Sequence, residues 1–241
     1  MSTSQIRVLI VAWLLTILVA CQVPAPITPV AHETLPDLHQ LYRDLARSNK
    51  VYALDPADSK LRIYVYRSGA AAQLGHNHVL SASKFEGYVS LPSEKTAEAQ
   101  FEIRLALNDL VVDDPAVRLE TGGNFSGSRT PSDIEGTRAN MLGDRGFDAE
   151  RYPWVRLSST SVEGDWPMLI AQVEVTLHGV TRSLPVSLRV HHDEKQLTAS
   201  GSFVLRQSDF GMTPFSALGG LMAVQDEVSI LFELKAKPVA L

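Results

Sequence analysis

The sequence predicts a mainly β protein, an antiparallel barrel of eight strands with one or two short helices. Three observations lead to this fold class. Apolar residues occupy every second position in about eight separate segments. Turn-forming residues separate these segments, as at Gly179. The run from Met168 to His178 is long enough to span about 35 Å as a strand, which suits a deep barrel better than a small sandwich.

Each alternating segment has one apolar face and one polar face, the pattern of a half-buried strand. The segments begin at Leu61, Phe85, Phe101, Val155, Leu169, Val186, Phe203 and Val228. A barrel of eight strands is either filled by its own side chains or holds one small ligand. If it is hollow, the expected apolar, ligand-binding channel residues are Leu61, Ile63, Val65, Phe101, Ile103, Leu105, Val173, Val175, Leu177, Val186, Leu188, Phe203, Leu205, Ile230 and Phe232.

Two segments carry helical signals instead. A short helix is expected over residues 37–49, with Asp37 as N-cap and with Leu38 and Tyr42 on its apolar face. A second helix is expected where Ser132 and Glu135 match a capping box, ending at Gly143. Residues 121–129 are rich in Gly, Ser and Asn and are expected to form a loop.

The N-terminal segment has the features of a secretion signal. Residues 8–20 contain no charge, which is too short for a membrane span but suits a signal peptide. The following Leu-Val-Ala-Cys ending resembles a bacterial lipobox, so residues 1–20 are expected to be removed and Cys21 to be lipidated. An ordinary signal peptide followed by an unmodified cysteine is the alternative. Residues 21–36 then form a proline-rich tether, and residues 50–238 form the barrel domain.

A lipidated Cys21 predicts a protein of the bacterial cell envelope, attached to a membrane. Gln22 follows the cysteine, where aspartate often signals inner-membrane retention, so the outer membrane facing the periplasm is expected. The net charge of −5 and the lack of a basic cluster argue against nucleic acid as a partner. A single cysteine excludes an internal disulfide framework.

Several ordered motifs resemble the YceI-like family. They are Phe147–Pro153, Leu177–Thr181 and Ser208–Met212, together with Leu54–Ser59 and Asn140–Gly143. The resemblance covers about residues 51–237. It implies a lipocalin-like barrel with a long apolar channel that binds a polyisoprenoid, such as a quinone or polyprenyl lipid. It implies no catalytic residues, so the protein is expected not to be an enzyme and to carry no cofactor other than bound lipid.

Two further groups of residues are candidates for contacts at the channel mouth. Phe210, Met212 and Phe215 give an apolar character to a glycine-flanked loop, which either covers the bound lipid as a lid or packs on the rim. His76 and His78 are two residues apart, so on a strand both imidazoles would lie on one face. They are candidates for hydrogen bonds to a lipid headgroup, or for a metal or haem site, although a tight metal site needs further ligands.

Other functions remain as alternatives. A structural lipoprotein with a filled barrel would show the same alternation. A barrel inserted in the outer membrane would carry aromatic girdles, which these strands lack. A hydrolase is disfavoured because neither a Gly-x-Ser-x-Gly nor a His-Glu-x-x-His motif occurs.

Overall fold

The computed structural model describes residues 35–239. The predicted signal peptide, Cys21 and nearly all of the predicted tether lie outside these residues. The helices are α1 (Leu38–Leu45), α2 (Pro115–Thr121) and α3 (Pro131–Leu142). The strands are β1 (Lys50–Leu54), β2 (Lys60–Ser68), β3 (His78–Ala82), β4 (Glu86–Leu91), β5 (Gln100–Ala106), β6 (Leu110–Val112), β7 (Trp154–Asp165), β8 (Met168–Leu177), β9 (Val180–His192), β10 (Leu197–Arg206), β11 (Ser216–Ala217) and β12 (Met222–Pro238). Between residues 35 and 239, no helix combines the length and apolar character that a membrane span requires.

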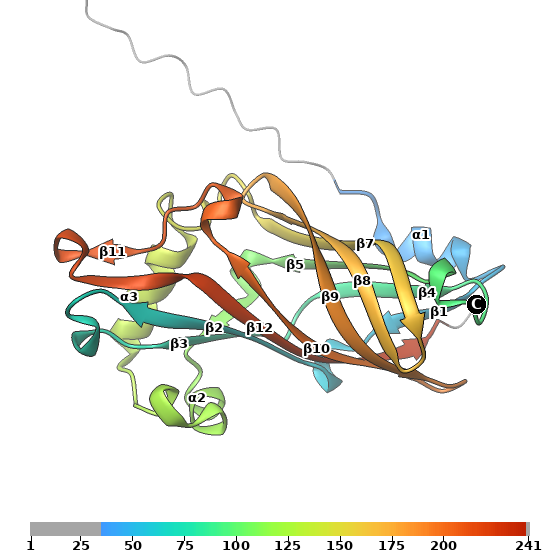
Figure 1. The fold of residues 1–241 in the computed structure, drawn as a ribbon, viewed down its shortest axis with the longest axis horizontal. Helices are drawn as coiled ribbons and strands as arrows, with labels where there is room; N and C mark the ends of the chain where they lie inside the picture. The colour runs from blue at the N-terminus through green and yellow to red at the C-terminus, as the bar shows by residue number, and fades with distance from the viewer. Residues whose placement is uncertain (1–34, 240–241) are drawn as a thin grey trace, which may run out of the picture. The chain divides into compact units, whose positions relative to one another are not determined.

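The strands form a closed antiparallel barrel (Figure 1). Each strand in the series β1-β4-β5-β7-β8-β9-β10-β12 pairs with the next, and β12 pairs back with β1. The ring therefore contains eight strands, which confirms the predicted fold class. Closure leaves the sheet without a free edge along this ring, which protects it from edge-to-edge aggregation.

The remaining strands extend the barrel wall toward one end. The 17-residue strand β12 pairs with β1 near its C-terminus and with β2 along most of its length. The strand β3 in turn pairs with β2, and β6 pairs with β3. Because β1 and β2 lie along the same edge of β12, they act as two halves of one long strand, interrupted by a 3-10 turn at Pro56–Asp58.

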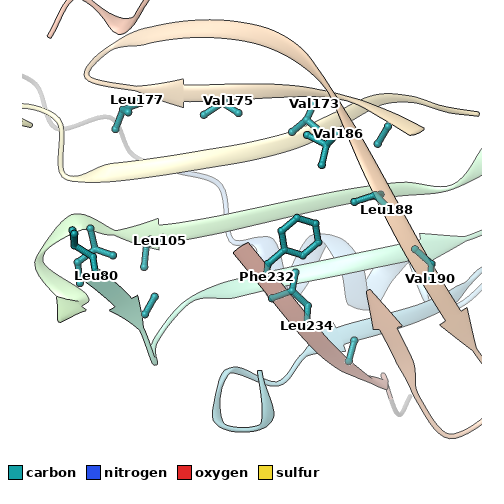
Figure 2. Packing of buried hydrophobic residues seen from close by; sticks show 14 of the residues in the cluster. Leu80, Leu105, Val173, Val175, Leu177, Val186, Leu188, Val190, Phe232 and Leu234 are labelled. Atoms are coloured by element: carbon teal, nitrogen blue, oxygen red, sulfur yellow. The ribbon is translucent and has the colours of Figure 1, made fainter. Parts of the chain in front are cut away.

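The alternating sequence pattern places one face of each strand inside the barrel. In β8, five inward residues from Leu169 to Leu177 are at most 5% exposed, whereas Met168 and Ile170 are about half exposed. Figure 2 shows inward side chains of β5, β8, β9 and β12 directed toward a common interior. The predicted two-faced strands therefore enclose a continuous apolar interior.

Helix α1 packs on the outside of the barrel. Asp37 caps it as predicted, accepting a hydrogen bond from the Gln40 N–H at 3.0 Å. Leu38 and Tyr42 are buried against Val51 and Tyr88, the outward residues of β1 and β4. The stacked rings of Tyr42 and Tyr88 lie 4.9 Å apart. Burial raises the pKa of the Tyr42 hydroxyl to about 12.

The other two helices differ from the prediction. Helix α2 was not expected, and the segment predicted as a loop from residue 121 contains its last residue and a 3-10 turn. Helix α3 occurs where it was predicted and ends before Gly143, but its capping box uses Thr130 and Asp133. The predicted box at Ser132 was wrong because Pro131 already occupies the first helical position, which suits proline and places the cap at Thr130, two residues earlier than predicted.

Candidate functional site

The barrel contains a cavity of about 780 Å³. All fifteen predicted channel residues line it, and they come from β2, β5, β8, β9, β10 and β12. Further apolar side chains from β1, β3, β4 and β7 complete the wall, among them Leu54, Leu80, Val89 and Leu157. Ligand sites in proteins usually have volumes of about 300–1,000 Å³. The cavity is therefore large enough for a ligand, and an interior filled by its own side chains does not describe this barrel.

One end of the cavity is closed by apolar residues, which are buried except for the partly buried Trp166. Leu91, Trp166, Val190 and Leu197 line this end, where the β4–β5, β7–β8 and β9–β10 connections meet. The Trp166 indole N–H donates to the Glu94 carbonyl at 3.2 Å, which ties two of these connections together. A ligand cannot leave through this end without disrupting packed side chains.

The opposite end is open. The exposed residues that line the cavity are Asn140, Asp144 and Arg145 at the end of α3, together with Gly211, Thr213, Phe215 and Ser216 between β10 and β12. Both segments line the cavity at this end. Nearly all polar lining side chains lie at this end, so the cavity has an apolar interior and a polar opening. An elongated molecule with one polar end matches this arrangement.

A buried charged cluster holds one polar residue of the cavity wall. His78, the first residue of β3, lines the cavity, and its Nδ1 lies 2.6 Å from Asp113 Oδ2. Asp113 is 1% exposed and also accepts from the Val79 N–H and from Arg118 of α2, at 3.0 and 2.5 Å. Burial alone would raise the pKa of Asp113, but the hydrogen bonds with His78, Val79 and Arg118 outweigh it and lower the pKa. The cluster thus fixes the position and orientation of the His78 ring.

His76 does not share this position. The predicted strand around the two histidines was wrong, because β3 begins at His78 and residues 72–74 form a 3-10 turn. His76 therefore precedes the strand and does not line the cavity. Partial burial, aided by the charges of Arg129 and His78, lowers the pKa of His76. The two imidazoles are not presented on one strand face, as a shared site would require.

The described residues contain no group of three or more His, Cys, Asp or Glu side chains arranged to hold a metal ion. Asp113 already engages the Nδ1 atom of His78, and Arg118 in turn pairs with Asp113.

The three residues expected in a lid lie in different places. Phe210 is 1% exposed, belongs to a 3-10 turn and does not line the cavity. Met212 is buried and lines it, whereas Phe215 lines it while remaining 48% exposed. Of the three, only Phe215 lies at the opening itself. Phe210 and Met212 instead pack in the core of the barrel.

Sequence reasoning missed the partners of His78 and the α3 side of the mouth. Asp113 and Arg118 lie 35 and 40 positions beyond His78, so no local spacing connects them. The dipeptide Asp114-Pro115 is a helix-start signal, because Asp114 caps α2 and Pro115 takes its first position. Recognising it would have placed Arg118 on a helix beside Asp113.

Comparison with known proteins identifies the family. The YceI-like domain model matches residues 52–236, which is most of the chain. The chain belongs to the YceI-like family. This confirms the resemblance drawn from the ordered motifs. No curated protein sequence matches the chain.

Solved structures share the fold of this YceI-like chain. BcnA from Burkholderia cenocepacia aligns with a TM-score of 0.56 at 17% identity, covering 76% of this chain and 99% of BcnA. A polyisoprenoid-binding domain from Saccharophagus degradans, implicated in plant cell wall breakdown, aligns with a TM-score of 0.54 at 14% identity, covering 78% and 98%. At these identities the comparison establishes the shared fold.

Proposed function

We propose that this protein binds a hydrophobic lipid of isoprenoid type, a quinone or polyprenyl lipid, inside its barrel. The observation that carries this proposal is the cavity of about 780 Å³ with an apolar wall and with exposed polar residues gathered at one end. Family membership supports it, since one structural relative is a polyisoprenoid-binding domain. The protein acts as a carrier or reservoir and not as an enzyme.

The driving force for binding is removal of the ligand tail from water. Each buried CH₂ group contributes about 0.8 kcal/mol, so a tail of several isoprene units gains several kcal/mol before the entropy of ordering it is subtracted. The residues expected to contact the tail are the fifteen inward side chains, such as Val175 of β8 and Phe232 of β12. The polar end of the ligand lies toward the mouth, and His78, which lines the cavity and is held by Asp113, is the candidate for a hydrogen bond to it.

The setting proposed for this activity is the bacterial cell envelope. The signal-like residues 1–20 and the lipobox-like Leu18–Cys21 support export and lipidation of Cys21. A lipidated tether would hold the barrel at the periplasmic face of the outer membrane. Two or more acyl chains give stable anchoring, whereas one chain binds only marginally.

The test is organic extraction of protein purified from its native source, followed by mass spectrometry. We expect a prenyl lipid in near-stoichiometric amount. Val175→Trp, which fills part of the cavity, is expected to lower the lipid content several-fold. Glu174→Trp is the matched control, because Glu174 lies next along β8 with its side chain exposed to solvent. Recovery of no prenyl or acyl lipid from the native protein would contradict the proposal.

A further inference from the structure

Exposed apolar side chains gather on two loops beside the cavity mouth. They are Leu74 on the β2–β3 loop and Phe215, Leu218 and Leu221 on the β11–β12 hairpin, and each is 48–66% exposed. We propose that these two loops, here called the mouth tip (residues 68–75 and 213–222), insert into the surface of a lipid bilayer. Docking would allow lipid to be loaded into the cavity, and this purpose rests on the proposed function.

The β11–β12 hairpin projects away from the barrel wall. Ser216 and Ala217 pair with Ala223 and Met222, and the turn between them consists of residues 218–221. A Cβ atom added to Gly219 or Gly220 would meet no heavy atom within 4 Å. Leu218 and Leu221 therefore flank a turn that stands in open space. In Figure 1 this hairpin lies at the extreme end of the barrel, beyond α3 and β3.

The β2–β3 loop is bound to the same hairpin. The Ala71 N–H donates to the Leu221 carbonyl at 2.8 Å. A Cβ atom on Gly69 would approach that same carbonyl oxygen, and Gly69 has a φ of +93°, so glycine alone permits this contact. The two loops therefore form one surface, which carries Leu74 beside Leu218 and Leu221.

The mouth tip contains no charge. No Asp, Glu, Lys or Arg occurs at residues 68–75 or 210–225, although 20% of the chain is charged. Removing a charge from water costs several kcal/mol, whereas burying a leucine or phenylalanine gains about 1.5–3 kcal/mol. This combination of exposed apolar side chains and missing charge suits the interfacial and hydrocarbon region of a membrane.

The position of the mouth tip beside the cavity opening favours a bilayer over other binding partners. Phe215 and Ser216 belong to the mouth tip and also line the cavity, so docking would place the opening against the membrane. A lipid then passes between the bilayer and the cavity with little exposure to water. A second copy of the chain fits less well, because a stable dimer interface uses about 20–30 residues a side and the tip offers four exposed apolar side chains.

The test places a reporter at the tip. In the full-length chain with Cys21→Ser, a cysteine is introduced by Leu218→Cys and labelled with an environment-sensitive fluorophore. The matched control is Ile170→Cys, since Ile170 is 50% exposed on the outer face of β8 toward the closed end. Both proteins are mixed with phosphatidylethanolamine–phosphatidylglycerol vesicles that contain brominated acyl chains.

We expect a blue shift and quenching of the label at position 218 and neither at position 170. This readout depends on position, so attachment through the N-terminal segment does not produce it. A label at position 218 that remains in water, or equal quenching at both positions, would overturn the proposal.

A second variant separates docking from lipid binding. Leu218→Ser combined with Leu221→Ser is expected to slow the uptake of a polyprenyl lipid from vesicles several-fold without changing the amount bound at equilibrium, because neither residue lines the cavity. If neither the wild type nor the variant binds polyprenyl lipid at equilibrium, while the mouth tip of the wild type still inserts into vesicles, the proposed function is refuted and docking stands. A concentration-dependent dimer that these substitutions abolish would assign the tip to a second copy and overturn docking.

Discussion

The ion pair of Asp113 and Arg118 connects the site to the stability of the fold. Both side chains are almost completely buried, with 1% and 2% exposure. Arg118 also donates to the carbonyls of Asn77 and Gly127, so it joins α2, the start of β3 and the loop before α3. Removing one partner of such a pair leaves the other charge buried and unpaired, which costs more than the pair itself contributes.

Asp113→Asn is therefore expected to lower the free energy of unfolding by about 3–5 kcal/mol. The control is Asp109→Asn, because Asp109 pairs with the exposed Lys84 and surface pairs contribute about 0–1 kcal/mol. Urea denaturation of both variants at pH 7 measures the difference. Similar small losses in the two variants would show that Asp113 is not needed to neutralise Arg118.

The pH dependence of stability provides a separate check on Asp113. Its pKa is lowered in the folded protein, so the unfolded chain, with a carboxyl pKa of about 3.9, takes up the proton at higher pH. The stabilisation is complete above about pH 4 and is lost as the pH falls through the folded pKa. The difference in free energy of unfolding between wild type and Asp113→Asn should therefore become smaller below about pH 4. A difference that does not change with pH would contradict the lowered pKa of Asp113.

Single residues differ in how well the sequence predicts them. The fifteen side chains predicted to form the channel all line the cavity, because a period of two places them on one face of each strand. The environment of His78 was not predicted, because it depends on Asp113, which lies in the left-handed region at a φ of 52° directly after β6. Only tertiary structure brings these residues together.

At the scale of elements, helix α3 forms one side of the cavity mouth and depends on its cap. The Thr130 hydroxyl accepts from the Asp133 N–H at 3.1 Å, and the Asp133 carboxylate accepts from the Thr130 N–H at 3.2 Å. These bonds satisfy two backbone donors that the first helical turn leaves free. The hydrogen bonds of α3 to the rest of the barrel include Arg138, which donates to the carbonyls of Leu110 and Asn108.

Thr130→Ala is expected to destabilise the protein by about 1 kcal/mol, the usual effect of losing an N-cap. Ser132→Ala is the matched control and should change stability by less than about 0.5 kcal/mol, because Ser132 is exposed within the first turn. Thermal unfolding followed by circular dichroism compares the two. A larger loss for Ser132→Ala would restore the capping box that the sequence pattern indicated.

The elements show where pattern reading succeeds. Strands with five or more alternating residues, such as β8 and β12, were identified because burial on one face imposes a clear period. Helix α2 has seven residues and one buried side chain, Arg118, so it has no apolar stripe to detect. Its stability comes from capping by Asp114 and from tertiary contacts, which a hydrophobic pattern does not record.

For the whole molecule, the barrel wall and the cavity inside it depend on different interactions. The barrel is closed by backbone pairing, so the wall does not need a filled interior to hold its shape. An alternating sequence predicts the wall but does not specify the volume that it encloses. The volume depends on side-chain sizes around the ring and on the side chains that close one end, such as Trp166.

Under the proposed function, lipid bound in the cavity should raise the stability of the folded protein. A ligand that binds only the folded state stabilises it by about 2.7 kcal/mol at a free concentration one hundred times its dissociation constant. We therefore expect the native, lipid-loaded protein to unfold several degrees above the delipidated protein, and a polyprenyl lipid added back to restore the difference. Differential scanning calorimetry of both forms measures it.

Val175→Trp should reduce this difference in melting temperature because the indole occupies part of the ligand space, while Glu174→Trp should retain it in full because its side chain is outside the barrel. Identical melting temperatures of loaded and delipidated wild type would mean that the cavity contributes nothing to stability through a ligand. A difference that is undiminished in Val175→Trp would place the stabilising lipid elsewhere, for example on the exposed mouth tip. The pair of variants thus links the measured stability to the interior of the barrel.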